Sequence, residues 1–391
     1  MYNHIPGHGV LKRKDLIVNK VAKYMDKFKG REQCFNNETF FPFSYRLYRT
    51  DECKEFFRIL NSEAYKTSLA EEPIQYLIKV GYGAHRAKGV YLLDQEQTAK
   101  LKKKYGSKGS KCGKIKRRLI AQTYVTNPLL LDMNNKFDFR VYMLVASTNP
   151  LIAYYHDGFL RVSLHTYDKF SNDRSTHLTN THLSKKTFAE AKDHKINNMT
   201  EQELRDYQMW DFERLEAYLL ESGKISDPNW VNNTLRPMFK KAFIHTVRMS
   251  AASFWKGSNV FEMFGLDFML DDKFNLWFIE CNASPQLIGT NPKKTEFLSK
   301  MLRDLFEIQY SLYRGRMTRL AKLLEDFMAE KERNPNPDLE LWHKKYEAEM
   351  VNRFDPQFPI SKDNSFEIII DETRKGADVY MGYLDPVCAA D

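Results

Sequence analysis

Two acidic side chains and one amide side chain have the spacing of a metal site. Two apolar runs flank the polar turn at residues 271–274, which predicts an antiparallel hairpin. A four-residue loop would place Asp267 opposite Phe278, with Glu280 at the diagonal position. Asn282 continues the same face, and oxygen ligands of this kind suit Mg²⁺. The alternative is that both acids are solvated or ion-paired residues of an edge strand.

A second predicted hairpin carries a lysine and a glycine-containing turn. Residues 75–79 and 90–93 predict its strands, and Gly81 and Gly83 lie between them. Glycines let backbone N–H groups approach phosphate oxygens, and Lys79 supplies a positive charge. The segment matches neither a Walker motif nor a GxGxxG fingerprint. A surface hairpin without a ligand is therefore the alternative interpretation.

Four charged residues lie on two predicted neighbouring strands. The odd-numbered positions of residues 137–145 are apolar, so Lys136, Asp138 and Arg140 share the opposite face. Arg161 follows on the next strand. These residues form either a polar wall of a site or a ladder of ion pairs between the strands.

The remaining sequence predicts the elements that hold these residues in place. We expect a strand at residues 119–125, a hairpin turn at 156–158 and a polar loop at 177–180. In residues 184–256 apolar residues recur at helical spacing, which predicts several helices, and the tail from residue 293 is predicted to be mostly helical. The pattern indicates a mixed α/β (α+β) fold.

The positive charge of the chain is concentrated in one short segment. The formal net charge is +9, and residues 100–118 contain no acid. Its glycines and serines predict a mobile, solvated loop that captures a polyanion, or else a solubilising loop without a partner. A nucleic-acid partner is disfavoured because only one aromatic residue, Tyr105, lies among the basic ones. The basic residues are Lys100, Lys102, Lys103, Lys104, Lys108, Lys111, Lys114, Lys116, Arg117 and Arg118.

The composition is that of a globular chain. It has 391 residues, of which 42% are hydrophobic, enough for a substantial core. No apolar run is long enough to cross a membrane, and the first residues lack the apolar core of a secretory signal. Five cysteines without CxxC spacing argue against a disulfide framework and favour a reducing compartment.

Further segments accompany these motifs in a characteristic order. They are Arg13-Lys14-Asp15, Tyr76-Leu77-Ile78-Lys79, Asn127-Pro128-Leu129-Leu130, Lys136-Phe137-Asp138-Phe139-Arg140, Asp157-Gly158-Phe159-Leu160-Arg161, His177-Leu178-Thr179-Asn180, Phe264-Gly265-Leu266-Asp267 and Glu280-Cys281-Asn282-Ala283-Ser284-Pro285. The ordered set resembles the tubulin tyrosine ligase-like family from about residue 3 to residue 306. The resemblance implies an ATP-grasp fold, in which two sheets enclose a nucleotide.

The resemblance also implies roles for individual residues. Asp267, Glu280 and Asn282 match the magnesium ligands. Arg140 and Arg161 match arginines that face the reacting carboxylate, and with Glu280 they form the expected catalytic set. The expected nucleotide contacts are Lys14, Lys79, Gln122, Thr123, Val125, Lys136, Thr179, Asn180 and Asp267.

We expect four regions along the chain. Residues 1–70 form an N-terminal subdomain, and residues 71–130 form a central ATP-grasp subdomain that includes the basic loop. Residues 131–313 form the C-terminal ATP-grasp subdomain, and residues 314–391 a helical or irregular extension.

Enzymes of the resembled family use ATP and Mg²⁺ to convert a carboxylate into an acyl phosphate, which an amino-acid amine then attacks. We therefore expect an ATP-dependent ligase that adds free amino acids to the glutamate-rich C-terminal tails of tubulin. Residues 5–15 resemble a glutamate-adding branch, and residues 163–180 resemble a glycine-adding branch. As the added amino acid we prefer glutamate, keep glycine as an alternative, and rank tyrosine last.

The alternative is a non-catalytic component of microtubules or axonemes that keeps the fold. The turn after Lys79 motivates it, because Val80-Gly81 and the extra His85 and Arg86 depart from the family pattern. All presumed metal and arginine positions are present, which favours an enzyme. We expect a cytoplasmic, cytoskeletal location at a cilium or basal body, with neither nucleic acid nor membrane as partner.

Overall fold

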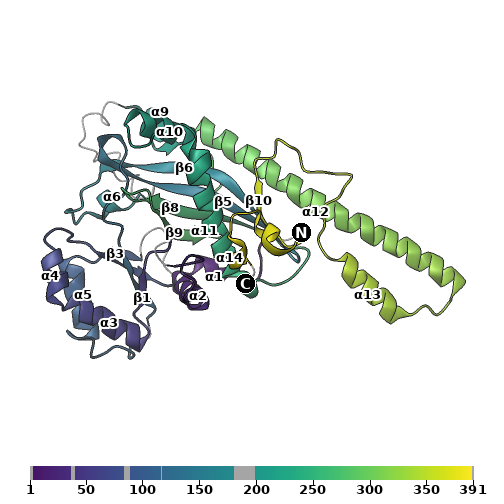
Figure 1. Ribbon diagram of the computed structural model, residues 1–391, viewed down its shortest axis with the longest axis horizontal. Helices are drawn as coiled ribbons and strands as arrows, with labels where there is room; N and C mark the ends of the chain where they lie inside the picture. Colours follow the sequence, from purple (N-terminus) through teal and green to yellow (C-terminus); the bar gives the residue numbers. More distant parts are fainter. Residues whose placement is uncertain (1–2, 37–39, 83–88, 116, 180–198, 390–391) are drawn as a thin grey trace.

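Two antiparallel sheets organise the molecule (Figure 1). The computed structural model describes residues 3–36, 40–82, 89–115, 117–179 and 199–389. The smaller sheet has the strand order β1 (Ser44–Arg46), β4 (Leu119–Thr123), β2 (Tyr76–Val80) and β3 (Val90–Leu92). The larger sheet has the order β10 (Glu367–Asp371), β6 (Leu151–Thr166), β5 (Asn135–Thr148), β8 (Glu262–Leu270) and β9 (Leu276–Asn282), with β7 (Met209–Trp210) also paired to β6.

Helices surround both sheets, which confirms the predicted mixed α/β (α+β) class. They are α1 (Gly9–Lys12), α2 (Lys14–Lys27), α3 (Thr50–Leu60), α4 (Glu63–Ser68), α5 (Gln95–Tyr105), α6 (Arg174–His177), α9 (Glu201–Tyr207), α10 (Phe212–Glu221), α11 (Arg236–Arg248), α12 (Pro292–Arg333), α13 (Leu339–Glu349) and α14 (Pro386–Ala389). Four short 3₁₀ or π turns join them, namely η2 (Asp132–Asn134), η3 (Val231–Leu235), η4 (Ala251–Ser253) and η5 (Gly376–Tyr380). Within the described ranges, no helix has the length and apolar character of a membrane span.

The predicted hairpin of residues 75–93 is confirmed as β2 and β3, and Lys79 pairs with Val90 across it. The basic segment is only partly a loop, so that expectation is corrected. Its first part continues α5, because Leu101 and Tyr105 lie four residues apart and bury one face of the helix in the small lobe. Beyond Gly106, which ends the helix, the chain is held by a disulfide between Cys112 and Cys53.

The two faces of strand β5 pack against two different hydrophobic cores. The predicted alternation is confirmed, since its odd-numbered apolar residues from Phe137 to Val145 share one core cluster. On the opposite face, Tyr142 and Leu144 pack instead against α12, which contributes Leu305. The polar residues Lys136, Asp138 and Arg140 lie at the start of this face.

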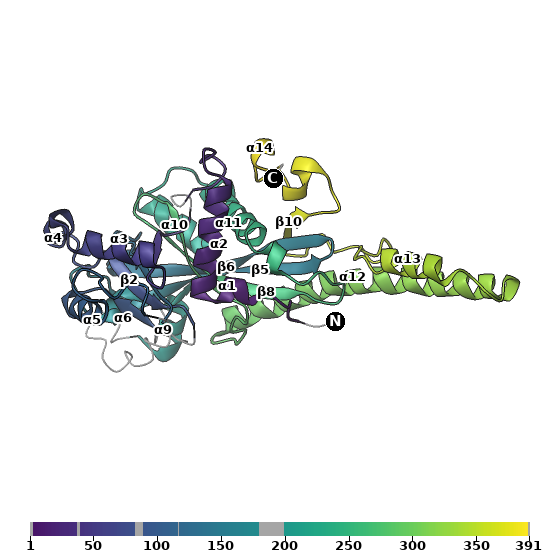
Figure 2. The same cartoon turned by 90° about the horizontal axis from the view of Figure 1, so that it is seen from below.

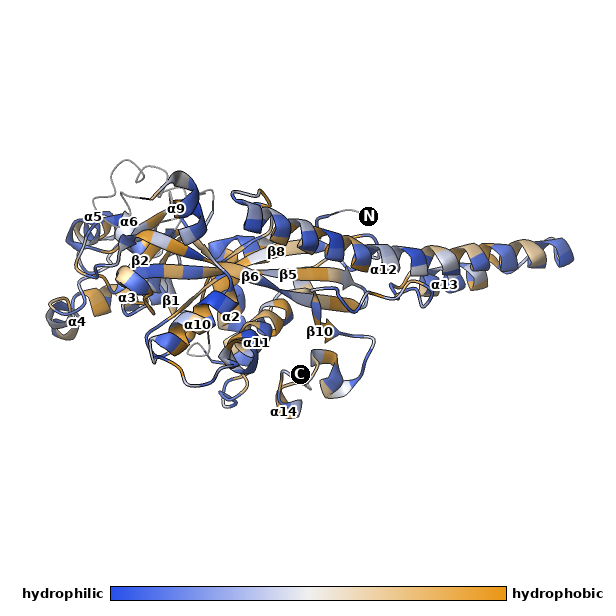
Figure 3. Ribbon diagram, turned by 90° about the horizontal axis from the view of Figure 1, so that it is seen from above, coloured by the Kyte–Doolittle hydropathy of each residue, from blue (hydrophilic) through white to orange (hydrophobic). Residues whose placement is uncertain are grey.

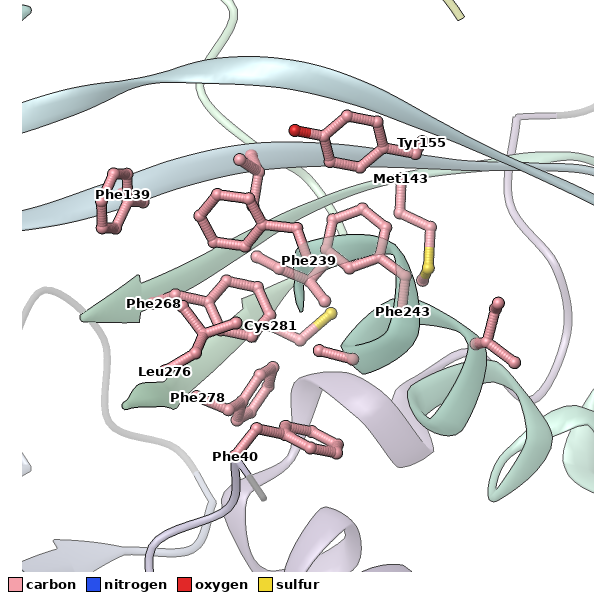
Figure 4. Packing of buried hydrophobic residues seen from close by; sticks show 14 of the residues in the cluster. Phe40, Phe139, Met143, Tyr155, Phe239, Phe243, Phe268, Leu276, Phe278 and Cys281 are labelled. Atoms are coloured by element: carbon pink, nitrogen blue, oxygen red, sulfur yellow. The ribbon is translucent and has the colours of Figure 1, made fainter. Parts of the chain in front are cut away.

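Aromatic side chains fill the core between α11 and the sheet. Figure 4 shows Phe239 and Phe243 of α11 lying beside Phe268 of β8. The ring centroids of Phe239 and Phe268 are 5.3 Å apart, and Phe268 and Phe278 make an edge contact at 5.5 Å. This packing holds β8 and β9 in place on one side, so their polar residues face the other.

The turn expected at residues 156–158 does not exist. Strand β6 runs unbroken through it, and the actual turn from β5 lies at Asn149-Pro150. The Asp157-Gly158 pair forms a bulge, because the register shifts between Tyr142 paired with His156 and Arg140 paired with Phe159. A Cβ at Gly158 would lie 1.6 Å from the Arg140 carbonyl oxygen, so only glycine fits there.

The C-terminal segment both leaves the body and returns to it. Helix α12 projects as an arm, and α13 folds back against it through a Phe327–Trp342 contact (Figure 2). Figure 3 shows that this arm is mainly hydrophilic, with scattered hydrophobic positions. Helix α12 ends just before Pro335 and Pro337, as the prolines require, and the chain later adds β10 to the large sheet.

Four of the five cysteines form disulfides, so the expectation that the chain lacks a disulfide framework is wrong. Cys34 is joined to Cys388, and Cys53 to Cys112. Only Cys281 is free, and it is buried. The partners are 354 and 59 residues apart, so local spacing could not reveal them.

Candidate functional site

The two sheets enclose a cavity of about 970 Å³ between them. Its walls come from α2, from β2 and β4 of the small sheet, and from β5, β6, β8 and β9 of the large one. Every site residue predicted from the sequence that the structure describes lines this cavity, whereas Asn180 lies outside the described residues. The lining includes Lys14, Lys79, Gln122, Thr123, Val125, Lys136, Arg140, Arg161, Thr179, Asp267, Glu280 and Asn282.

The three candidate metal ligands lie at one end of the hairpin formed by β8 and β9. Asp267 pairs directly with Glu280 and not with Phe278, so the predicted register is wrong by two residues at this position. The loop has five residues, and an extra residue in β9, Ile279, then bulges and brings the two acids opposite each other. The Asn282 amide donates to Glu280 Oε1 at 3.3 Å, so all three oxygen-bearing groups are close.

A buried cluster of arginines and carboxylates forms the adjacent wall. Arg161 donates to Asp138 at 2.6 and 2.9 Å, and its Nη2 lies 2.8 Å from Asp267. Arg140 also binds Asp267 through two hydrogen bonds. The predicted ladder of ion pairs therefore exists, and it is part of the cavity wall.

Burial and the neighbouring arginines have opposite effects on the pKa values of the two acids in this cluster. Burial alone would raise the pKa of Asp267, but Arg140 and Arg161 outweigh it and hold that pKa below its ordinary value. Burial raises the pKa of Asp138, although Arg161 opposes the effect. The cluster fixes both guanidinium groups toward the cavity, where they can bind an anion.

Two lysines are buried in the cavity without an ion pair to any described residue. Lys79 Nζ has only a 3.5 Å contact to the Ile279 carbonyl oxygen, and burial, followed by the charge of Lys14, lowers its pKa to about 8. Burial lowers the pKa of Lys136 to about 7. Buried cations of this kind favour an anionic ligand, because its charge would offset the cost of their desolvation.

Lys136 lies in a polar and aromatic box that sequence reasoning missed in part. Its Nζ donates to the Tyr124 hydroxyl and the His177 carbonyl oxygen, both at 3.0 Å. The Tyr124 hydroxyl also lies 2.8 Å from His177 Nδ1, and Tyr167 forms another side of the box. His177 belonged to a segment of the expected set, but no local pattern marked Tyr124 or Tyr167.

Helix α2 reaches the metal end of the cavity through its first residue. Lys14 Nζ lies 3.2 Å from Glu280 Oε2. Burial alone would raise the pKa of Glu280, but the positive charge of Lys14 outweighs it and lowers that pKa. Lys14 and Glu280 are therefore brought together, as the expected nucleotide and metal roles require.

A buried aspartate next to Lys14 anchors this helix. Asp15 accepts a hydrogen bond from Arg13 at 2.9 Å and one from Arg118 at 2.7 Å. Arg118 belongs to the basic segment, so one member of that segment serves the fold. A Cβ at Gly81 would lie 2.6 Å from the Asp15 Cβ, which explains why glycine follows β2.

The small sheet supplies the remaining wall. Gln122 is buried between β1 and β2 and donates to the Ser44 hydroxyl at 3.0 Å. The Thr123 hydroxyl donates to the Phe43 carbonyl oxygen at 3.3 Å. Thr179 closes the other side, where its hydroxyl donates to Asp138. All three residues were expected as nucleotide contacts, and that role remains a prediction.

The residues present fit a nucleoside triphosphate with Mg²⁺. Two carboxylates and an amide oxygen form a donor set that magnesium accepts, with phosphates and water as its other ligands. Lys79 and Lys136 supply buried positive charge, and the cavity lies within the size range of small-molecule sites. When bound, the metal ion would offset charge on a transferring phosphoryl group.

Comparison with known proteins identifies the family. The family model described as "Tubulin-tyrosine ligase family" matches residues 1–319. Protein polyglycylase TTLL10 of Macaca fascicularis is 29% identical over 262 residues, which cover 64% of this chain and 38% of that protein. A human relative is named inactive polyglycylase TTLL10. It is also 29% identical over 262 residues, which cover 35% of that protein.

A relative with another activity in its name is the tubulin polyglutamylase TTLL5 of Mus musculus. It is 26% identical over 298 residues, which cover 68% of this chain and 21% of that protein. The chain thus spans less than two fifths of the length of these three relatives. The family match extends over most of the chain and includes every cavity wall. The chain therefore belongs to the tubulin-tyrosine ligase family.

Proposed function

We propose that the protein is an ATP-dependent carboxylate–amine ligase that adds amino acids to the C-terminal tails of tubulin. One observation carries the proposal: buried lysines, paired arginines and a three-oxygen donor set line the same cavity. Phosphate, carboxylate and metal would each meet a complementary group there. Family membership supports the same reaction class.

In the proposed reaction, a glutamate carboxylate of the tail attacks the γ-phosphorus of ATP, and ADP departs. The amine nitrogen of the free amino acid then attacks the acyl carbon, loses a proton, and phosphate departs. Lys79 and Lys136 neutralise phosphate charge. Arg140 and Arg161, held by Asp267 and Asp138, orient the carboxylate and stabilise the oxyanion that develops on it.

The added amino acid is proposed to be glycine, with glutamate as the second candidate. The sequence alone narrowly favours glutamate. Two of the relatives described above carry polyglycylase in their names and match with higher identity than the polyglutamylase. Because these identities are all below 30%, the assay below includes both donors.

The tail would reach the cavity along the basic segment. Lys103 and Lys108 are exposed, and Lys102 is half-buried on α5. An acidic tail would be attracted to this surface before its carboxylate enters the site. A tubulin partner implies a cytoskeletal location, and we propose the cilium or basal body as its site.

A non-catalytic role on microtubules is the second candidate. It is favoured by the name of the inactive human relative and by the unusual residues that follow β2. That turn, residues 83–88, lies outside the described residues. Retention of every described candidate site residue supports the enzyme over this alternative.

The decisive assay offers ATP, Mg²⁺ and microtubules with labelled glycine, glutamate or tyrosine in parallel reactions. We expect label in tubulin tails from one donor, glycine before glutamate, and at least 100-fold less with Glu280→Gln. The exposed Glu347→Gln variant of α13 serves as a matched control and should retain activity. Absence of label from every donor, together with intact microtubule binding, would establish the non-catalytic alternative.

A further inference from the structure

A second cluster of ligand-type side chains lies outside the cavity, where the N-terminal segment meets the start of β8. One ring nitrogen each of His4 and His8 and one carboxylate oxygen of Glu262 lie within 4.8 Å of one another. His4 and His8 are four residues apart, a spacing found in zinc sites. None of the three lines the cavity described above.

The carboxylate of this cluster is buried in an apolar strand. Glu262 is 0% exposed and pairs with Val145 across the sheet. Among the described residues, only the two histidines lie within ion-pair distance of it. A buried carboxylate is costly without a counter-charge. A cation would supply it.

The surrounding groups hold these side chains as outer partners hold metal ligands. The Ile5 N–H donates to Glu262 Oε2 at 2.9 Å, which leaves Oε1 beside His4 at 3.1 Å. His8 Nδ1 lies 2.8 Å from the Ile5 carbonyl oxygen and 3.6 Å from Glu262 Oε2, so a metal ion bound by this nitrogen would replace its hydrogen bond to Ile5. Metal-ligating carboxylates typically accept such a hydrogen bond from a neighbouring group, as Glu262 does from Ile5.

We propose that His4, His8 and Glu262 bind one Zn²⁺ ion, with water as the fourth ligand. Two imidazoles and one carboxylate are a known zinc ligand set. A tetrahedral zinc site brings its ligand atoms to about 3.3 Å of one another, so small side-chain rotations would close the present cluster. The His4 side chain is 44% exposed, which gives water and metal access.

The zinc would tie the N-terminal segment to β8. Glu262 begins β8, and Asp267 lies five residues later, roughly 17 Å along the strand. The N-terminal segment leads through α1 into α2, whose first residue is Lys14. Zinc would therefore fix the position of α2 beside the candidate active site without taking part in the chemistry, and this inference does not depend on the ligase assignment.

Titration of the metal-free full chain with Zn²⁺ alone, in competition with a chromophoric chelator, tests the proposal. We expect one equivalent of tightly bound zinc, and binding at least about tenfold weaker in His8→Ala and in Glu262→Gln. Co²⁺ substitution should give the visible absorption of a tetrahedral site. The exposed His343→Ala and the cavity variant Glu280→Gln should leave the stoichiometry at one.

Two outcomes would overturn the proposal. One is the absence of stoichiometric zinc in the unaltered chain, and the other is zinc binding that His8→Ala leaves unchanged. If Glu262→Gln does not fold, the two histidine variants decide. Both histidines are partly exposed, so replacing them disturbs the core less than replacing Glu262. A rise in melting temperature with zinc, absent in His4→Ala, would be independent support.

Discussion

The two buried lysines make nucleotide binding dependent on pH. Lys136 and Lys79 have pKa values of about 7 and about 8, because burial disfavours their charged forms. A bound polyphosphate would raise both pKa values, so binding takes up protons. Affinity is then full below pH 7 and falls as the pH rises through these values.

We therefore expect the affinity for ADP to fall between pH 7 and pH 9, by up to about tenfold per pH unit for each lysine. Isothermal titration calorimetry at several pH values measures this. Lys136→Met should bind more weakly at pH 7 and show a flatter pH dependence. Affinity that is constant across this range in the unaltered protein would contradict the role of both lysines.

Residue types were predictable from the sequence at the metal end of the site, but their exact pairing was not. Alternation placed Asp267 and Glu280 on one face, and both line the cavity. The register failed because the loop has five residues and Ile279 bulges from β9, which no pattern in the hairpin reveals. Tyr124 and Tyr167 were missed because their contacts with Lys136 depend on tertiary packing.

At the scale of elements, the attachment of α2 to the small sheet is the most consequential contact. Buried Asp15 joins Arg13 of the α1–α2 junction to Arg118 beside β4. We expect Asp15→Ala to lower the free energy of unfolding by about 1–3 kcal/mol, since it removes the carboxylate that two partly exposed arginines bind. Denaturant unfolding measures the change.

The same variant should also weaken nucleotide binding, because Lys14 is the adjacent residue. Asp26→Ala, at an exposed position of the same helix, is the matched control and should change stability by less than about 0.5 kcal/mol. Equal stability of the two variants would mean that Asp15 does not anchor α2.

The basic segment gives a second prediction at this scale. Binding of a glutamate-rich tail peptide should weaken steeply as salt rises from low ionic strength, because exposed charges are screened. Lys103→Glu combined with Lys108→Glu should weaken binding further and flatten the salt dependence. Fluorescence anisotropy measures both effects, and Lys29→Glu, at an exposed position just after α2, is the control. Salt-independent binding would show that these charges do not capture the tail.

Elements with a regular period were predictable, and irregular ones were not. The strands of both hairpins and the break after α12 follow from alternation and from proline. Glycine-rich composition suggested a loop for the whole basic segment, but Leu101 and Tyr105 make its start helical. Asp157-Gly158 fits a turn and a bulge equally well, so its place within β6 required the structure.

At the scale of the whole molecule, the C-terminal segment completes the fold that carries the site. Ile369 and Ile370 of β10 are fully buried against the large sheet, more than 200 residues from their partners in β6. Pairing over such a separation leaves no local signature, so the sequence predicted only an irregular tail. The disulfide between Cys34 and Cys388 joins the C-terminal segment to a second distant part of the chain, the segment that follows α2.

We expect Ile370→Ala to lower the free energy of unfolding by about 2–5 kcal/mol, because it leaves a cavity in the core of the large sheet. Val387→Ala, at an exposed position near the C-terminus, should change it by less than about 0.5 kcal/mol. Thermal or denaturant unfolding distinguishes them. Similar values for both would place β10 outside the cooperative unit.

Magnesium-dependent nucleotide binding is the most direct test of the account. Calorimetric titration with a non-hydrolysable ATP analogue should give one site per chain, and removal of Mg²⁺ should weaken binding at least tenfold. Glu280→Gln should abolish the magnesium dependence, because Glu280 is a proposed ligand. No binding by the unaltered chain, or an unchanged magnesium dependence in Glu280→Gln, would contradict the proposed site.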